Sequence, residues 1–324
     1  MSNYIHPIKL NNLIIPNNIF LAPMAGVTDM PYRKLCKEMG AGLVYTEMVS
    51  SKAIHYGSEK TEGISKVFDE ERPVAIQIFG SEPDTMAETA QKLSEFADII
   101  DINMGCPVNK IVKNNEGSAL MKNIKFAEEI ISTVAKSVKI PVTVKFRKGY
   151  DSKHVNAVEF AQMAEASGAK LITIHGRTRE DMYSGKSDLE IIKQVKSAVK
   201  IPVIGNGDIV EAKSAKNMFD YTGVDGIMIA RGSVGNPWIF RNIIEYLENN
   251  NLIENPTLEE RIDMAIRHLN ETIKYKGEYT GIREMRKNLF LYIKGLPNAT
   301  ELRNKISILE TKEEVTSLLL SLKQ

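Results

Sequence analysis

The sequence has few cysteines and no excess of charge of either sign. Of its 324 residues only Cys36 and Cys106 are cysteines, which is too few for a disulfide framework or an all-cysteine metal site and fits a reducing compartment. Lys and Arg total 42 and Asp and Glu total 41, giving a net charge of +1. This balance excludes nucleic-acid binding by bulk electrostatic attraction, so any such binding requires a local basic patch.

Signals for metal binding and for membrane insertion are also missing. The five histidines are scattered along the chain and form no HExxH or similar spacing, which excludes the common zinc motifs. No apolar run approaches the roughly 18 residues of a membrane span, and the N-terminus carries no basic segment followed by an apolar stretch. We therefore expect a cytoplasmic protein with no metal, no membrane attachment and no obligate protein partner.

Short apolar runs rich in β-branched residues recur up to residue 232 and alternate with segments, such as 126–138 and 155–167, that have helical spacing. Continuous Val and Ile runs are typical of parallel strands buried on both faces, and eight βα units within about 250 residues predict a (β/α)8, or TIM, barrel. An open doubly wound sheet is disfavoured because no GxGxxG motif follows the first strand. The predicted strands and their ends cover 19–26, 42–49, 73–80, 98–107, 141–149, 170–178, 201–209 and 224–232.

Beyond the eighth unit the strand pattern stops and the sequence becomes helical. Thr257 is a predicted N-cap with Glu260 three residues later, and an apolar stripe at helical spacing follows. Further helices are predicted over 282–294 and 312–322. The predicted domains are a barrel at 1–244 and a smaller all-helical domain at 245–324.

Polar side chains of uncommon kinds follow the predicted strands. In a (β/α)8 barrel the carboxyl ends of all strands meet at one rim, where the active sites of this fold lie. A buried amide or charge costs several kcal/mol unless it is partnered, so a set contributed by six strands indicates a ligand rather than solvated loop residues. The set comprises Gln77, Asn103, Cys106, Lys145, Arg147, His175, Arg177, Asn206, Asp208 and Arg231.

Two glycine-containing turns indicate what the ligand carries. Residues 204–208 (Ile-Gly-Asn-Gly-Asp) and 230–233 (Ala-Arg-Gly-Ser) follow the seventh and eighth predicted strands. The loops after these strands form the customary phosphate site of the fold, with backbone N–H groups as donors and Arg231 as a bidentate partner. A pair of tight turns without a ligand is the alternative.

Three side chains of the set allow more than one chemistry. Lys145 on an apolar strand could form a Schiff base, as in aldolases, or stay charged beside an anionic cofactor ring. His175 could orient a ring, act as an acid or base, or fill the rim. Cys106 lies in an Asn-Met-Gly-Cys-Pro turn, where an exposed and mostly protonated thiol can donate a proton or attack. Cys36 lies among apolar residues at helical spacing and is interpreted as a core side chain.

The C-terminal part contains one basic segment. Between residues 274 and 294, Arg283, Arg286 and Lys287 share a helix face by their spacing. This face could grip a nucleic-acid backbone or be a solvated helix surface.

Motifs throughout the chain together resemble one enzyme family. They are Ala22-Pro-Met-Ala-Gly-Val-Thr-Asp29 with Pro31 and Arg33, Ile76-Gln-Ile-Phe-Gly80, Asp101-Ile-Asn-Met-Gly-Cys-Pro107, Val144-Lys-Phe-Arg147, Thr173-Ile-His-Gly-Arg-Thr178, Gly205-Asn-Gly-Asp208, Ala230-Arg-Gly232 and Asn236-Pro-Trp238. Over nearly its whole length the sequence is similar to the bacterial tRNA-dihydrouridine synthases, most closely to the DusB-like branch.

The resemblance implies an FMN-containing (β/α)8 barrel with a C-terminal helical domain that binds tRNA. Such an enzyme uses NADPH to reduce the C5=C6 bond of particular uridines in tRNA to 5,6-dihydrouridine. Cys106 is implied to protonate C5 of uracil while the reduced flavin delivers hydride to C6. Asn103 and Arg177 are implied to contact the flipped-out base. The other implied contacts are Pro23, Met24 and Ala25 packed against the flavin, Gln77, Lys145 and His175 bonded to its rings, Asn206, Gly207, Asp208, Ala230 and Arg231 at its phosphate, and Arg283, Arg286 and Lys287 at the tRNA.

Three other functions stay open at this point. An FMN-dependent small-pyrimidine reductase or dehydrogenase of the dihydroorotate type uses a similar barrel, but a free nucleobase needs no basic docking helices. A Schiff-base aldolase would trap its substrate on Lys145 with borohydride and carry no yellow cofactor. A non-catalytic RNA-binding protein would be unaffected in activity and tRNA affinity by Cys106→Ala.

Overall fold

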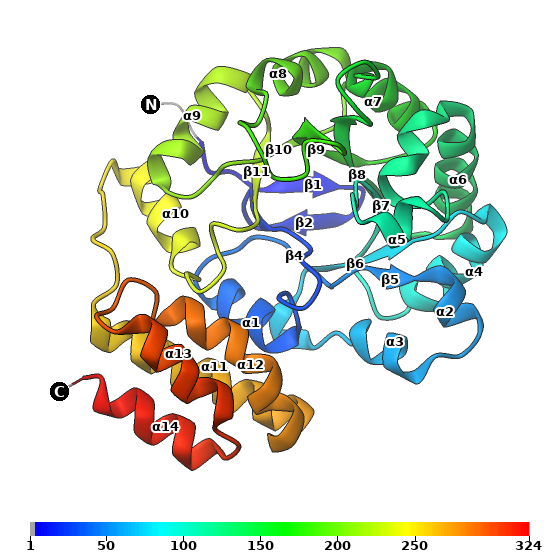
Figure 1. The fold of residues 1–324 in the computed structure, drawn as a ribbon. Helices are drawn as coiled ribbons and strands as arrows, with labels where there is room; N and C mark the ends of the chain where they lie inside the picture. Colours follow the sequence, from blue (N-terminus) through cyan, green and yellow to red (C-terminus); the bar gives the residue numbers. More distant parts are fainter. Residues whose placement is uncertain (1–3, 324) are drawn as a thin grey trace.

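The computed structural model describes residues 4–323. Its main sheet is parallel throughout, with the hydrogen-bonded order β3 (Ile19–Leu21), β11 (Gly226–Ile229), β10 (Val203–Asn206), β9 (Leu171–Thr178), β8 (Val142–Gly149), β7 (Ile99–Met104), β6 (Val74–Phe79) and β4 (Val44–Tyr45), and with β5 (Val49–Ser50) also beside β6. A parallel bridge between Phe20 of β3 and Leu43, just before β4, closes the sheet into the barrel seen in Figure 1. The predicted (β/α)8 barrel is therefore confirmed.

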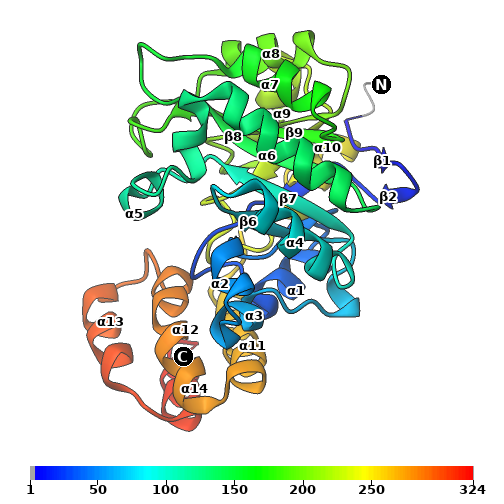
Figure 2. The same cartoon turned by 90° about the vertical axis from the view of Figure 1, so that its right-hand side faces the viewer.

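Helices alternate with the strands and cover the outside of the barrel (Figures 1 and 2). They are α1 (Met30–Glu38), α2 (Ser51–His55), α3 (Glu59–Ile64), α4 (Pro83–Ser94), α5 (Asn109–Val112), α6 (Ile124–Ser137), α7 (Ala157–Ala166), α8 (Leu189–Ala198), α9 (Ala212–Thr222) and α10 (Ile239–Asn249), with 3₁₀ helices η1 (Asp69–Glu71) and η2 (Gly117–Lys122). Outward side chains of the strands pack with the inner faces of these helices in the largest apolar cluster. In α6, for example, Ile130, Ile131 and Val134 are buried at helical spacing.

Inward side chains form a separate apolar layer with an N-terminal hairpin. Phe20, Tyr45 and Met228 belong to this layer, together with side chains of β1 (Ile8–Leu10) and the antiparallel β2 (Leu13–Ile15). Figure 2 shows the hairpin at the end of the barrel opposite α5, which is the end where the strands begin. This hairpin was not predicted from the sequence, because each of its strands has only 3 residues, which is too short for a recognisable period.

The C-terminal part consists of α11 (Leu258–Lys276), α12 (Glu278–Tyr292), α13 (Ala299–Ile308) and α14 (Lys312–Ser321), gathered on one side of the barrel (Figures 1 and 2). The predicted cap is confirmed, since Thr257 and Glu260 accept hydrogen bonds from each other's backbone N–H groups. These helices have their own apolar cluster, whereas α10 packs with the barrel cluster. The predicted boundary between residues 244 and 245 falls within α10 and stays a prediction. Within residues 4–323 no helix is long and apolar enough to cross a membrane.

Helix α1 connects the two apolar clusters. Its Tyr32 belongs to the barrel cluster, as does the buried Cys36, and its Leu35 belongs to the cluster of the C-terminal helices. Tyr32 also stacks on His268 of α11, with ring centroids 5.2 Å apart. Helix α1 therefore links the C-terminal helices to the barrel.

A buried ion pair holds α1 against η1, the segment before β6. The Arg33 guanidinium donates to both carboxylate oxygens of Glu71, at 2.5 and 2.9 Å, and both side chains are 1% exposed. Arg33 Nη1 also donates to the carbonyl oxygen of Thr28 at 2.9 Å. Removing one partner of such a pair leaves a buried charge without compensation.

We expect Glu71→Ala to lower the free energy of unfolding by about 3–5 kcal/mol, because Arg33 keeps its charge without its buried partner. Urea unfolding followed by circular dichroism measures this change. Glu301→Ala, which removes the exposed pair with Lys305, is the control and should cost less than about 1 kcal/mol. Equal effects of the two substitutions would contradict this expectation.

Candidate active site

A cavity of about 760 Å³ opens at the rim where the barrel strands end. Its volume lies in the range typical of cofactor and small-molecule sites. Within residues 4–323 no group of three or more His, Cys, Asp or Glu side chains is arranged to hold a metal ion. Of the predicted site residues, Arg177 and the three basic residues of α12 do not line the cavity. Those that do are Pro23, Met24, Ala25, Gln77, Asn103, Cys106, Lys145, His175, Asn206, Gly207, Asp208, Ala230 and Arg231.

Two amide side chains on neighbouring strands form one part of the cavity wall. Gln77 lies on β6 and Asn103 on β7, and both are buried. Asn103 Nδ2 donates to Gln77 Oε1 at 2.7 Å. Asn103 Oδ1 accepts from the backbone N–H groups of Gly105 and Cys106 at 3.1 and 2.9 Å. The amide pair therefore connects the barrel interior with the turn that carries the thiol.

Cys106 is half-buried in the turn after β7. Its carbonyl oxygen accepts from the backbone N–H and the hydroxyl group of Ser118 at 3.1 and 2.9 Å. Gly117 lies against the same oxygen with φ at +60°, and a Cβ atom there would approach it to 2.9 Å. Burial raises the pKa of the Cys106 thiol above its ordinary value, so the group is protonated at neutral pH. The turn thus presents a proton donor to the cavity.

Lys145 of β8 and His175 of β9 supply the nitrogen-bearing part of the wall. Burial, and secondarily the charge of Arg147, lowers the pKa of Lys145 to about 8, so the ammonium form persists at neutral pH. Within the described part of the chain no hydrogen bond or ion pair engages this ammonium. Burial and the neighbouring cations hold the pKa of His175 well below its ordinary value, so its ring is neutral. A half-buried ammonium without a partner is stabilised by an acceptor or anion, which a ligand can supply.

Backbone N–H groups without partners gather where β10 and β11 end. They line the cavity and belong to Gly207, Asp208, Arg231 and Gly232. The hydrogen bonds found among residues 4–323 include none donated by these groups. Gly207 has a φ of +128°, and a Cβ atom there would lie 2.3 Å from Ser187 Oγ, so the turn requires glycine at this position. Free amide donors beside a guanidinium can hold a phosphate group.

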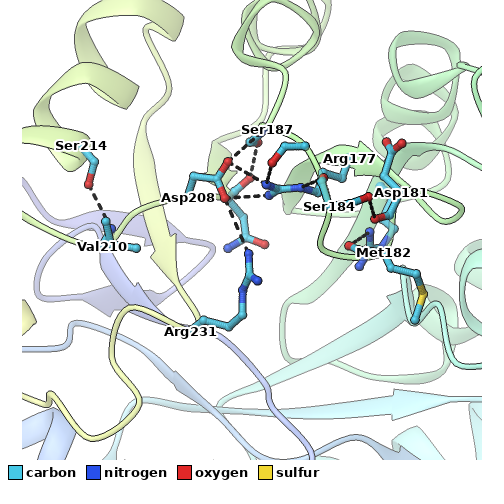
Figure 3. Close-up of polar contacts among 12 residues, drawn as sticks. Arg177, Asp181, Met182, Ser184, Ser187, Asp208, Val210, Ser214 and Arg231 are labelled. Atoms are coloured by element: carbon cyan, nitrogen blue, oxygen red, sulfur yellow. Dashed lines mark hydrogen bonds and ion pairs between the residues drawn. The ribbon is translucent and has the colours of Figure 1, made fainter. Parts of the chain in front are cut away.

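The Asp208 carboxylate is held by Arg177, as Figure 3 shows. Arg177 Nη1 and Nη2 donate to its two oxygens at 2.8 and 2.9 Å, and the Ser187 N–H donates to it at 2.8 Å. Although burial acts in the opposite direction, these bonds hold the pKa of Asp208 below its ordinary value. Arg231 lies 3.7 Å from the same carboxylate. Arg177 also donates to two carbonyl oxygens of the 184–185 turn, so four of the five N–H groups of its guanidinium form hydrogen bonds.

Arg147, a member of the predicted polar set at the rim, also lines the cavity, although the family resemblance implied no particular contact for it. Its Nε donates to the carbonyl oxygen of Gly105 at 2.9 Å, and its Nη1 donates to two carbonyl oxygens of the 178–182 segment. The sequence does indicate which way its side chain points. Arg147 follows Lys145 by two residues on one strand, so the two side chains lie on the same face of the sheet. Other lining residues without a recognised signal in the sequence include Val27, Met48, Val108, Tyr183 and Val210.

The three basic residues predicted to bind tRNA lie on α12 and differ in their contacts. Arg283 pairs with Glu310 at 3.2 Å and lies over the ring of Tyr279 at 3.6 Å. Arg286 donates to a backbone carbonyl oxygen at the end of α13 at 2.9 Å. Lys287 is exposed. A role of these residues in RNA binding stays a prediction.

We expect iodoacetamide to alkylate Cys106 but not Cys36 in the folded chain, because Cys36 is fully buried. The thiolate is the reactive form and burial raises the pKa of Cys106, so the rate should increase about tenfold per pH unit between about pH 7 and 8.5. Mass spectrometry of the alkylated peptides measures the rates, with Cys106→Ala as the control. A rate independent of pH in this range would show that the thiol is already ionised.

Known proteins resemble this chain over most of its length. Residues 20–324 match the family described as dihydrouridine synthase. The chain is 42% identical over 304 residues to a probable tRNA-dihydrouridine synthase of Rickettsia bellii, with 93% of each chain covered. It is 40% identical over 312 residues to tRNA-dihydrouridine synthase B of Pasteurella multocida, covering 96% of this chain and 94% of that relative.

Solved structures with low sequence identity share the fold. A 2-naphthoyl-CoA reductase complex has a TM-score of 0.60 at 13% identity over 76% of this chain, which spans about half, 52%, of that longer protein. An old yellow enzyme homologue of Zymomonas mobilis has a TM-score of 0.54 at 14% identity, covering 78% of this chain and 94% of the other. These likenesses show the fold alone. The match over residues 20–324 and the two bacterial relatives show that the chain belongs to the dihydrouridine synthase family.

Proposed function

We propose that this chain is an oxidoreductase that reduces the C5=C6 bond of specific uridines in tRNA to 5,6-dihydrouridine, with FMN as cofactor and NADPH as reductant. The observation that carries the proposal is one cavity wall in which the protonated thiol of Cys106 and the unpaired ammonium of Lys145 face the same space. The names of the two bacterial relatives support the substrate. The likeness in fold to an old yellow enzyme homologue is consistent with a flavin.

The donors of the cavity fit FMN. The unpaired ammonium of Lys145 suits an electron-rich ring edge, and the free N–H groups at 207–208 and 231–232 suit a phosphate group. When bound, the reduced flavin supplies the hydride that C6 of uracil receives. We assign the ring system to Gln77, Lys145 and His175, the phosphate to Asn206, Gly207, Asp208, Ala230 and Arg231, and packing against the flavin to Pro23, Met24 and Ala25.

Cys106 donates the proton that C5 of uracil receives. Burial keeps the thiol protonated at neutral pH, so the proton is available when the base enters. The positive charges of Arg147 and Lys145 act against burial and lower the pKa of Cys106, which stabilises the thiolate left after the transfer. A proton from solvent then restores the thiol.

Asn103 and Arg177 are assigned to the uracil base, which must leave its stack to reach the cavity. Asn103 borders Cys106 directly, which supports its role. Arg177 does not line the cavity, and it has one N–H group of Nη1 left to donate to a base.

The tRNA backbone is assigned to the helical domain at 245–324, and the chemistry to the barrel at 1–244. A charged helix face can contact phosphates without reading sequence. We expect the chain to act in the cytoplasm with tRNA and NADPH as partners, without a membrane, a metal or an obligate protein partner. The residues assigned to the tRNA are Arg283, Arg286 and Lys287.

With Cys106→Ala we expect FMN to stay bound and tRNA reduction to fall by about 10²–10⁴-fold, the usual contribution of general acid catalysis. The purified chain is incubated with NADPH and tRNA from cells lacking the gene, and uridines are mass-mapped for a gain of two hydrogens. Cys36→Ala is the control and should retain activity. Colourless wild-type protein, or a fully active Cys106→Ala, would contradict the proposal. Reduction of a free pyrimidine without any change in tRNA would favour the dihydroorotate-type alternative.

With Lys145→Met we expect FMN to bind about 10- to 100-fold more weakly, because a hydrogen bond to a charged group contributes about 1.5–3 kcal/mol. Fluorescence titration of the apoprotein with FMN measures the dissociation constant. Lys113→Met, at an exposed position, is the control. Unchanged FMN affinity in Lys145→Met would remove this residue from the cofactor site, and borohydride trapping of a substrate on it would favour an aldolase.

A further inference from the structure

A chain of hydrogen bonds runs from the barrel interior to the Cys106 turn. It begins at Asp101 of β7, which is 0% exposed. Thr143 Oγ1 of β8 donates to Asp101 Oδ1 at 2.5 Å, and Gln77 Nε2 donates to Asp101 Oδ2 at 2.7 Å. Asn103 donates to Gln77, and the backbone N–H groups at 105 and 106 donate to Asn103. The side chains in this series of hydrogen bonds are all buried, and the series ends at backbone N–H groups of the Cys106 turn.

The carboxylate gives the chain of hydrogen bonds a direction. An ionised carboxyl group only accepts, whereas an amide side chain can turn by about 180° and exchange its oxygen and nitrogen. Because Asp101 accepts from Gln77, the Gln77 nitrogen must face Asp101 and its oxygen must face Asn103. Asn103 must then present its nitrogen to Gln77 and its oxygen to the turn. Burial raises the pKa of Asp101 to about 6, against the hydrogen bonds from Gln77 and Thr143, so the group is still ionised at neutral pH.

We propose that Asp101 is a positioning residue that fixes the orientation of the Gln77 and Asn103 amides and, through them, the position of the Cys106 thiol. Asp101 does not line the cavity, so its influence on a ligand passes through these two side chains. The importance of Asp101 for catalysis rests on the proposed function, because the thiol is the proton donor of that reaction.

The orientation of the two amides also determines which hydrogen-bonding groups the cavity wall presents to a ligand. The oxygens of Gln77 and Asn103 are both used within the chain of hydrogen bonds. Each NH2 group keeps a second hydrogen, which in Asn103 only approaches the sulfur of Met48, at 3.9 Å between heavy atoms. With the ammonium of Lys145 on the next strand, this stretch of wall is rich in donors. It therefore favours acceptor atoms of a ligand at this place.

The test is Asp101→Asn, which keeps the shape of the side chain but lets it donate as well as accept. The backbone N–H groups of the turn then remain as the one fixed end that orients Gln77 and Asn103, so the preference for this orientation weakens. In the turned state, which becomes populated, these N–H groups lose their acceptor. We expect alkylation of Cys106 by iodoacetamide to become about tenfold faster, as expected when buried donors lose their acceptor. We expect kcat of tRNA reduction to fall about tenfold, with KM unchanged, because the proton donor is displaced.

A double variant, Asp101→Asn with Gln77→Glu, moves the carboxylate from position 101 to position 77, the next side chain in the series of hydrogen bonds. The new carboxylate at position 77 accepts from both neighbours, so Asn103 is again held with its oxygen toward the turn. We expect the alkylation rate of Cys106 to return to within about twofold of wild type, because the acceptor of the turn is restored. Thr143→Val is the matched control, measured at about pH 8.5 so that Asp101 stays ionised without the hydrogen bond that lowers its pKa, and its rate should equal that of the wild type at the same pH.

Alkylation of Cys36 in the same samples reports unfolding, because this thiol is buried in the folded chain. An unchanged Cys106 rate in Asp101→Asn overturns the proposal, and so does an equal increase in Thr143→Val. If Asp101→Asn unfolds, the test is made with the double variant. The proposal is then supported only if the alkylation rates of both Cys106 and Cys36 return to their wild-type values. The alkylation requires no tRNA, so a chain that fails to reduce tRNA refutes the proposed function and leaves this result standing.

Discussion

Residues two apart on a β-strand point to the same side of a sheet, and in a closed barrel the inner side opens only at the two ends. The register pairs Asp101 of β7 with Gln77 of β6 and with Thr143 of β8, so these polar side chains share one interior layer. Asn103 and Lys145 form the next pair toward the rim. The strand register therefore orders the polar interior layer by layer, and the thiol-bearing turn follows where the layers reach the cavity.

The electrostatic character of the cavity follows from what these layers contain. Lys145, Arg147 and Arg231 all line it, while the nearby Asp208 carboxylate is shared between Arg231 and Arg177. The result is a local positive field in a chain whose net charge is only +1. Such a field attracts an anionic ligand, keeps the neighbouring imidazole neutral and stabilises a thiolate once a proton has left.

The barrel and most of the cavity wall can be predicted from the sequence, because Val and Ile runs alternating with amphipathic segments leave few other arrangements, and strand ends meet at one rim. Contacts between distant residues cannot be predicted in this way. Arg177 turns to Asp208, 31 positions away, and Arg147 holds the carbonyl oxygen of Gly105, and neither contact leaves a local pattern. The hairpin at residues 8–15 cannot be predicted for a different reason, because its strands are too short to show a hydrophobic period.

That hairpin packs with Phe20 and Tyr45 inside the end of the barrel where the strands begin. Among residues 4–323 the hairpin therefore closes this end of the barrel. A ligand reaches the cavity from the opposite end, at the rim where the strands end. Under the proposed function, the reductant and the tRNA nucleotide therefore share one entrance to the cavity.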